Sequence, residues 1–176
     1  QGNGAPEDFG TEQNPMPVLI GEGVVLNDVD HASVTNFGSA DIFGRNVGLA
    51  LFDVATAHIV NAGTVSANNY GIEIDNLEAS EATVINMGTI RVLGGVDLSA
   101  VMQGFENAAI IANDSTDLTV NHVGGSIMGD LFAGAGTEDT LTVTDASMAQ
   151  AVNGASEQQV RGFETIEFDG AVAFLS

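Results

Sequence analysis

The side chains that could do chemistry in this sequence are mainly carboxylates. The chain has 24 Asp and Glu residues against three Arg, and it contains neither Lys nor Cys. A polysaccharide hydrolase needs two carboxyl groups on one face, one acting as an acid and one as a base or nucleophile. Three scattered Arg do not supply the base and positive charge that a polysaccharide lyase needs. The candidate acids and bases are Asp53, Glu73, Asp75, Glu78 and Glu81.

Solvated surface is the simpler interpretation of these residues, because Asp and Glu side chains are mostly exposed in folded proteins. The chain has no Trp and one Tyr, so it lacks the aromatic platforms of a carbohydrate cleft. Nucleophile elbows, phosphate-binding loops and dinucleotide fingerprints are also missing from the sequence. We therefore expect no catalytic residues and no enzyme. The alternative is a polysaccharide hydrolase that uses Asp53, Glu73 and Asp75.

Candidate metal ligands are few. The segment 134–141 is similar to the calcium-binding nonapeptide G-G-x-G-x-D-x-U-x, which makes Glu138 and Asp139 candidate calcium ligands. One such turn cannot supply the six to eight oxygens that calcium takes. Without Cys, and with histidines that do not share a repeat position, zinc is not expected. The histidines are His31, His58 and His122. The sequence predicts no cofactor and leaves calcium as an open alternative.

The charge balance excludes whole classes of partner. The formal net charge is −21 at pH 7, which repels nucleic acids and anionic membrane surfaces. No apolar run approaches the length of a membrane-spanning helix, so membrane insertion is not expected. The hydrophobic fraction is 44% and the charged fraction only 15%, so the chain can still close a core.

A repeat organises most of the chain. Segments 34–40, 59–65 and 84–90 share the pattern apolar-x-Asn-x-Gly-Ser/Thr-apolar, and their asparagines are 25 residues apart. Further strand signals occur at 48–51, 71–74 and 108–111. One coil of this size cannot bury its apolar edge alone, so neighbouring coils must stack. We therefore expect an all-β, right-handed parallel β-helix of about five or six coils with a period near 25 residues.

Stacking at this period places equivalent residues in columns. The asparagines would form a buried amide ladder, and the glycines would supply a tight or left-handed turn. A degenerate fourth copy at 120–127 puts Asn121 in the asparagine position. The expected columns are Asn36, Asn61 and Asn86; Gly38, Gly63 and Gly88; Phe37, Ala62 and Met87; and Ser39, Thr64 and Thr89.

The remaining segments give a simple domain organisation. Residues 1–15 read as a flexible N-terminal tail, and 16–176 as a single solenoid domain with an insertion near 93–107. Two short helices are predicted, at 97–107 and 147–160. Because the chain begins at Gln1 without an initiating Met, we expect a processed form or an excised fragment.

These phrases resemble the repeats of bacterial autotransporter passenger domains and related large exported adhesins. The resemblance is carried by Asn61–Val65 and Asn86–Ile90, by Gly134–Val143 followed by Arg161–Ile166, and by the similar phrase at 104–107. It implies a right-handed parallel β-helix that is exported across the cell envelope. It also implies a role in adhesion, aggregation or display.

We expect an extracellular or bacterial cell-surface element that is structural or adhesive. A short solenoid has two open ends with unpaired strand edges, and both terminal strands here are apolar. We therefore expect end-to-end self-association into a filament or a longer rod. The expected contact residues at the C-terminal end are Val172, Phe174 and Leu175. A surface glycan or a protein receptor is the alternative partner.

Overall fold

The computed structural model describes residues 21–76, 78–94, 107–113, 115–134, 136–149, 158–170 and 173–175. Within these residues every regular element is a β-strand. The strands are β1 (Glu22–Asn36), β2 (Asp41–Gly44), β3 (Val47–Asn61), β4 (Thr64–Ala67), β5 (Tyr70–Asp75), β6 (Ser80–Asn86), β7 (Thr89–Val92), β8 (Ala108–Ala112), β9 (Thr116–His122), β10 (Ser126–Met128), β11 (Asp130–Phe132), β12 (Thr140–Thr144), β13 (Ser147–Ala149), β14 (Val160–Arg161), β15 (Thr165–Asp169) and β16 (Ala173–Leu175).

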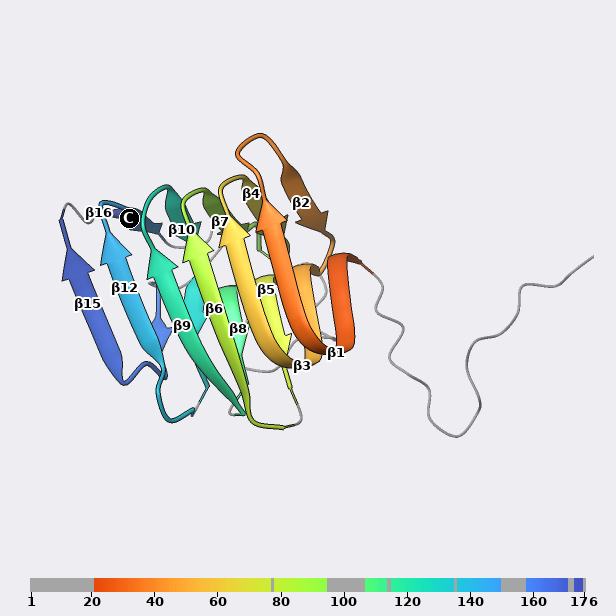
Figure 1. Cartoon of the computed structure of the whole chain (residues 1–176). Coiled ribbons are helices and arrows are strands. Elements are labelled where there is room, and N and C mark those ends of the chain that lie inside the picture. Colours follow the sequence, from red (N-terminus) through yellow and green to blue (C-terminus); the bar gives the residue numbers. More distant parts are fainter. Residues whose placement is uncertain are drawn as a thin grey trace, which may run out of the picture.

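The strands stack into two sheets, and every pairing is parallel. The larger sheet has the order β14-β11-β8-β5-β3-β6-β9-β12-β15, with β1 beside β3, and the smaller has the order β16-β13-β10-β7-β4-β2. Figure 1 shows β1, β3, β6, β9, β12 and β15 side by side with their arrows in one direction, and the smaller sheet behind them. The chain therefore winds as a parallel β-solenoid of about five turns, which confirms the predicted fold class.

The long strand β3 joins two faces of the coil. Its first part pairs with β5 and its second part with β6, while β1 follows it along its whole length. The strand signals predicted at 48–51, 71–74 and 108–111 lie side by side in β3, β5 and β8. Each coil therefore has one strand on each of three faces, as the period of about 25 residues suggests.

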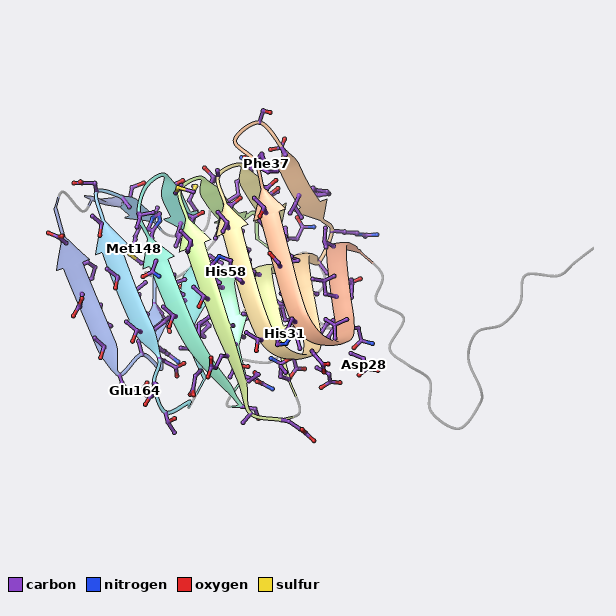
Figure 2. The ribbon with its side chains drawn as sticks, viewed as in Figure 1. Asp28, His31, Phe37, His58, Met148 and Glu164 are labelled. Atoms are coloured by element: carbon purple, nitrogen blue, oxygen red, sulfur yellow. The ribbon has the colours of Figure 1, made fainter. Side chains whose placement is uncertain are left out.

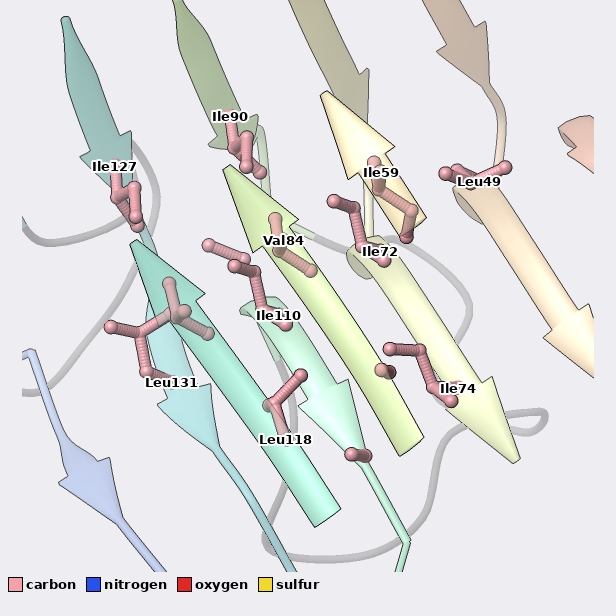
Figure 3. Close-up of a cluster of buried hydrophobic side chains, with 14 of the residues drawn as sticks. Leu49, Ile59, Ile72, Ile74, Val84, Ile90, Ile110, Leu118, Ile127 and Leu131 are labelled. Atoms are coloured by element: carbon pink, nitrogen blue, oxygen red, sulfur yellow. The ribbon is translucent and has the colours of Figure 1, made fainter. Parts of the chain in front are cut away.

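Alternating side chains of these strands fill the interior. In β6 and β9 every second residue is buried, the pattern of strands with one face on the core. Figure 3 shows the interior, where buried side chains of successive coils, such as Leu49, Ile72 and Ile110, follow one another from right to left. Full burial of a Leu or Ile side chain contributes about 1.5–3 kcal/mol, so these columns hold neighbouring coils together. One fully buried column consists of Leu49, Ile72, Ile110 and Leu131.

A ladder of buried amides runs along the solenoid next to this core. Nδ2 of Asn36 donates to Oδ1 of Asn61 at 2.8 Å, and Nδ2 of Asn61 donates to Oδ1 of Asn86 at 2.7 Å. Nδ2 of Asn36 also donates to the carbonyl oxygen of Thr64, the first residue of β4. In the same way, Nδ2 of Asn61 donates to the carbonyl oxygen of Thr89, the first residue of β7. The ladder therefore ties each coil to the next and satisfies backbone groups at the turn.

The fourth rung of the ladder differs from the prediction. The residue beside Asn86 is His122, whereas Asn121 lies beside Ile85 and points to the other face. Val120 takes the place beside Val84 in the core, as expected. Because side chains alternate along a strand, this one-residue difference puts His122 on the buried face and leaves Asn121 only partly buried. The alignment of Asn121 with the three repeat asparagines was therefore wrong by one residue.

Close packing of the backbone requires two of the three repeated glycines, Gly63 and Gly88. A Cβ at Gly88 would lie 2.1 Å from the carbonyl oxygen of Gly63, and one at Gly63 would lie 2.2 Å from that of Ala40. Gly38, in the first coil, would meet nothing closer than 3.7 Å. None of these three glycines has a positive φ; in the fourth turn Gly125 does. Gly38, Gly63 and Gly88 therefore do not have the left-handed form of the predicted turn, and among the described glycines at the equivalent turns only Gly125 does.

Two further predictions need correction. Thr64 lies beside Asp41 and Thr89, so Ser39 is not part of the hydroxyl column, which continues instead through Ser126. The helix predicted at 147–160 begins in strand β13 and ends in β14, and residues 150–157 between them lie outside the described residues. Short β-strand segments and amphipathic helices are hard to separate by pattern alone.

The tail at 1–15 and the segment 95–106, which contains most of the predicted insertion and of the helix at 97–107, lie outside the described residues. Asn107, at the end of that segment, lies in a turn with a φ of 68°.

Candidate functional site

Two aspartates occupy the bend of the two long strands. Asp28 in β1 and Asp53 in β3 have φ values of 56° and 52°. They lie on neighbouring coils. The residues before them, Asn27 and Phe52, are paired with each other, and so are the residues after them, Val29 and Val54. Left-handed backbone is uncommon outside glycine and costs about 1–3 kcal/mol, although Asp tolerates it better than most residues. The bend is therefore repeated, at some cost, in two successive coils.

A groove of about 360 Å³ lies beside this bend. Carboxylates dominate it, and in the described part of the chain no Lys, Arg or His lines it. Its potential is therefore negative, which would attract cations and disfavour anionic substrates. Figure 2 places Asp28 at the lower bend of β1, at the opposite end of the coil from the turn that carries Phe37. The lining residues are Asp28, Val29, Asp30, Asp53, Val54, Ala55, Asn76, Glu78, Ala79 and Ser80.

One wall of the groove is held by a buried polar network around Asn76. Its Oδ1 accepts from the backbone N–H of Val54 at 2.7 Å, and its Nδ2 donates to Oγ of Ser80 at 2.8 Å. The Nδ2 also donates to Oγ1 of Thr116 at 3.2 Å, which itself lies 3.0 Å from the Ser80 hydroxyl. Because every member has partners, the network fixes the turn between β5 and β6.

Glu73 in β5 has the most unusual carboxyl group among the candidate acids. Burial raises the pKa of Glu73 to about 7, and the nearby charges of Asp75 and Glu22 add to the increase. Its strand neighbours are the buried residues Ala50 and Ile111. Asp75 is exposed and accepts a hydrogen bond from Nδ2 of Asn113 at 2.7 Å. A half-protonated carboxyl beside an exposed carboxylate is chemically suited to proton transfer.

The alternative hydrolase residues are only partly brought together. Glu73 and Asp75 interact on one strand, and Asp75 lies beside Phe52, the residue before Asp53. Asp53 and Glu78, however, line the groove, while Glu73 and Asp75 do not. Glu81 lies on β6 beside Asp117, also outside the groove lining. Glu73, whose pKa is raised, therefore lies outside the lining of the groove.

The calcium candidates have different surroundings. Asp139 is fully buried, and its Oδ1 accepts from the backbone N–H of Leu118 at 2.6 Å. Its own N–H donates to Oε2 of Glu164 at 2.6 Å, whereas Glu138 is exposed. Burial raises the pKa of Asp139, despite the hydrogen bond from Leu118. Asp139 therefore links three successive coils, and its Oδ2 has no hydrogen-bond partner.

No group of three or more His, Asp or Glu side chains in the described ranges is arranged to hold a metal ion. His31 and His58 are exposed, and His122 is fully buried in the amide ladder. His58 lies beside Ser33 and Thr83, so it does not share a column with His122.

Both ends of the solenoid expose apolar side chains that belong to interior columns. Ile166 and Phe168 in β15 lie beside Leu141 and Val143, which are fully buried. Because no described strand follows β15 on that side, 44% of Ile166 and 54% of Phe168 are exposed. At the other end, Val29 in β1 is exposed in the same way. Among the described residues, the core is therefore continuous to both edges, and no further strand covers it there.

Two of the three predicted assembly residues lie at the C-terminal edge. Phe174 and Leu175 belong to β16 and lie beside Met148 and Ala149 in the register of the smaller sheet. Val172 falls outside the described residues. At the same end, the guanidinium of Arg161 lies 5.7 Å from the centre of the Phe132 ring, within reach of a cation–π interaction.

Two features of the site were not predicted from the sequence. Asp28 and Asp53 are separated by the repeat period of 25 residues, and that spacing could have revealed the repeated bend. The Asn76 network joins residues 40 positions apart and has no signal in the local sequence.

Comparison with known proteins adds no functional assignment. No protein-family model, curated protein or solved structure matches the chain. Within the described residues, no helix is long and apolar enough to cross a membrane.

Proposed function

We propose that this chain is a structural or adhesive element of the extracellular space or the bacterial cell surface, and that it associates end to end into a filament or a longer rod. The proposal is supported by the stacked coils and by the resemblance of the repeat phrases to exported passenger domains. Under this proposal the chain is not an enzyme, and a surface glycan or protein receptor would bind along its sides.

The observation that carries the proposal is the open core at both ends. Leu141 and Val143 are fully buried only because β15 covers them, and the residues that cover them are about half exposed. A further coil placed on this edge would bury Ile166 and Phe168 in the same way. Unpaired strand edges of this kind readily accept another strand.

The distribution of charge favours joining at the ends. With a net charge of −21, two rods lying side by side repel each other along their length. At the ends the exposed residues of the interior columns are apolar, so burial there is favourable. The same charge keeps the rods soluble.

Sedimentation velocity and electron microscopy at micromolar concentrations test this function. We expect rods or filaments, and we expect Ile166→Glu to abolish them by placing a charge in the core column at the open end. Met87→Glu is a matched control, because Met87 is exposed at a turn on the side of the solenoid. Monomers at every protein and salt concentration would contradict the proposed function.

A second candidate is a polysaccharide hydrolase, favoured by the raised pKa of Glu73 beside Asp75. In this role Glu73 would protonate the leaving group and Asp75 would act as base or nucleophile. Release of reducing sugar from neutral polysaccharides, lost in Glu73→Gln and retained in Glu81→Gln, would support it. No release from a panel of such polymers would reject it.

A further inference from the structure

We propose that the occupant of each open end is a second copy of this chain, joined head to tail, so that β1 continues the column of β15 and β2 continues that of β16. The strands at the junction keep the parallel register that successive coils have within the chain. This inference rests on the proposed end-to-end association and specifies its geometry.

The register of the junction follows from columns that run the whole length of the solenoid. One interior column passes through Val34, Ile59, Val84, Val120, Leu141 and Ile166 without a break. Adding one more coil in the same register places Val34 of the next copy on Ile166. The outward neighbours then follow, with Ser33 of the next copy beside Thr165 and Thr35 beside Glu167.

The apolar surfaces at the two ends match in this register. Val34 in β1 is only partly buried, although its column neighbour Ile59 is almost fully buried. The exposed part of the Val34 side chain can therefore be covered by a residue of another copy. A second interior column runs from Val24 through Leu49, Ile72, Ile110 and Leu131 to Val160. The junction would place Val24 on Val160, so both columns meet apolar residue to apolar residue.

The smaller sheet extends in the same way. Its column from Ile42 through Val65, Ile90, Ile127 and Met148 ends at Phe174, and the neighbouring one runs from Phe43 to Leu175. The backbone of β2 would therefore lie beside that of β16, with Ile42 of the next copy at Phe174. Both sheets continue across the same junction without a change of register.

Charge selects this orientation over the alternatives. In the head-to-tail register Glu167 meets Thr35, Glu164 meets Ala32, and Arg161 meets Val25, so neither of these two carboxylates faces another carboxylate. A head-to-head contact would instead pair β1 with β1 of another copy, so Asp28 and Asp30 near the middle of this strand would lie close to the same residues of that copy. Like charges on facing strands repel, and the strands at this contact would have to pair antiparallel, unlike any pair among the described strands.

Besides Glu164, which would lie on the buried residue Ala32, the ladder column is mismatched at the junction. It runs from Asn36 through Asn61, Asn86, His122 and Val143 to Phe168, so the junction places an amide on an aromatic ring. Within the chain, this column already changes from a polar to an apolar residue where His122 lies beside Val143. The junction therefore lacks one hydrogen bond of the ladder, and it should be weaker than the contacts between coils.

Disulfide cross-linking tests the register directly, since the chain has no native Cys. Thr35 and Glu167 are exposed and would face each other about 4.8 Å apart, within the range that a disulfide spans. Oxidation of the double variant Thr35→Cys with Glu167→Cys should give a ladder of covalent multimers. An equimolar mixture of the two single variants should give covalent dimers and nothing larger.

The matched control moves one cysteine out of register. Thr35→Cys with Thr165→Cys would leave the two Cα atoms about 8 Å apart, too far for a disulfide, so cross-linking should fall at least fivefold. Dimers of Thr35→Cys alone would indicate a head-to-head contact and overturn the inference. Filaments of the unmodified protein without cross-links in the in-register pair would overturn the junction and leave the proposed function standing. An unmodified protein that stays monomeric would overturn both.

Discussion

Nδ2 of Asn86 donates to Nδ1 of His122 across 3.1 Å, so a histidine continues the buried asparagine ladder. On the other side of the ring, Nε2 lies 2.9 Å from the carbonyl oxygen of Ser147, which can only accept. The proton therefore lies on Nε2, and Nδ1 accepts from Asn86. The ring is fully buried, and this burial lowers the pKa of His122. His122 therefore takes part in the ladder in its neutral form.

Acid should weaken the solenoid through this rung. The pKa of His122 lies below its ordinary value of 6.5 in the folded state, so its contribution to stability is present above pH 6.5 and is lost as the pH falls through the folded value. His122→Asn keeps a side chain that can donate and accept, and it removes the titration. Urea denaturation at pH 8 and pH 5 should show that the wild-type protein loses more free energy of unfolding than the variant. Equal losses would contradict this role for His122.

Glu73 should act on stability in the opposite direction. Its pKa is raised from 4.5 to about 7, so its contribution is present below pH 4.5 and is lost as the pH rises through 7. Glu73→Gln removes the buried charge, so the variant should gain free energy of unfolding relative to wild type between pH 5 and pH 8. Glu81→Gln, at an exposed position, is the control and should show no such gain. A flat difference for Glu73→Gln would show that the carboxyl group is not desolvated.

The central rung of the ladder should matter most for stability. Asn61 accepts from Asn36 and donates to Asn86 and to the Thr89 carbonyl, and it is fully buried. Asn61→Ala leaves these partners unsatisfied, at about 1–3 kcal/mol for each buried group. Urea denaturation should show a loss of about 2–5 kcal/mol. Asn36→Ala, at the edge coil, should cost less, and the reverse order would contradict the ladder as a cooperative element.

The glycine columns give a matched pair of substitutions. Gly88→Ala would drive a Cβ to 2.1 Å from a backbone oxygen of the neighbouring coil, so the coils must separate. We expect a loss of about 1–3 kcal/mol or more, as in other overpacked sites. Gly38→Ala has 3.7 Å of clearance and no positive φ, so it should be neutral or stabilise by up to about 1 kcal/mol. Equal effects in thermal unfolding would mean that coil spacing does not set the glycine requirement.

Salt should promote assembly. The net charge of −21 opposes contact between copies, and ionic strength or divalent cations screen that repulsion. Light scattering at 10 mM and 500 mM NaCl should show larger particles at the higher concentration, while Ile166→Glu should stay small in both. Dispersal of the particles by salt would show that attraction between charges, rather than burial of apolar ends, holds the assembly together.

The sequence alone was sufficient for the architecture. Asn36, Asn61 and Asn86 are spaced by one coil, and apolar residues flank each of them at the same positions. This regular spacing is enough to predict a stack of coils. The interior column through Val34, Ile59 and Val84 follows from the same spacing. Repetition makes this prediction strong, because one coil is stable only against another of similar shape.

Tertiary structure decided what repetition does not specify. His122 replaced Asn121 in the ladder because Val120 had to enter the core, and a strand can bury only every second side chain. Asp41, rather than Ser39, joined the column of Thr64, since turn length differs between coils. Glu73 acquired its raised pKa from burial and from Glu22 and Asp75, one of which is distant in sequence. Local spacing determines that coils stack, whereas burial of side chains between the coils determines the register and the chemistry of each carboxyl group.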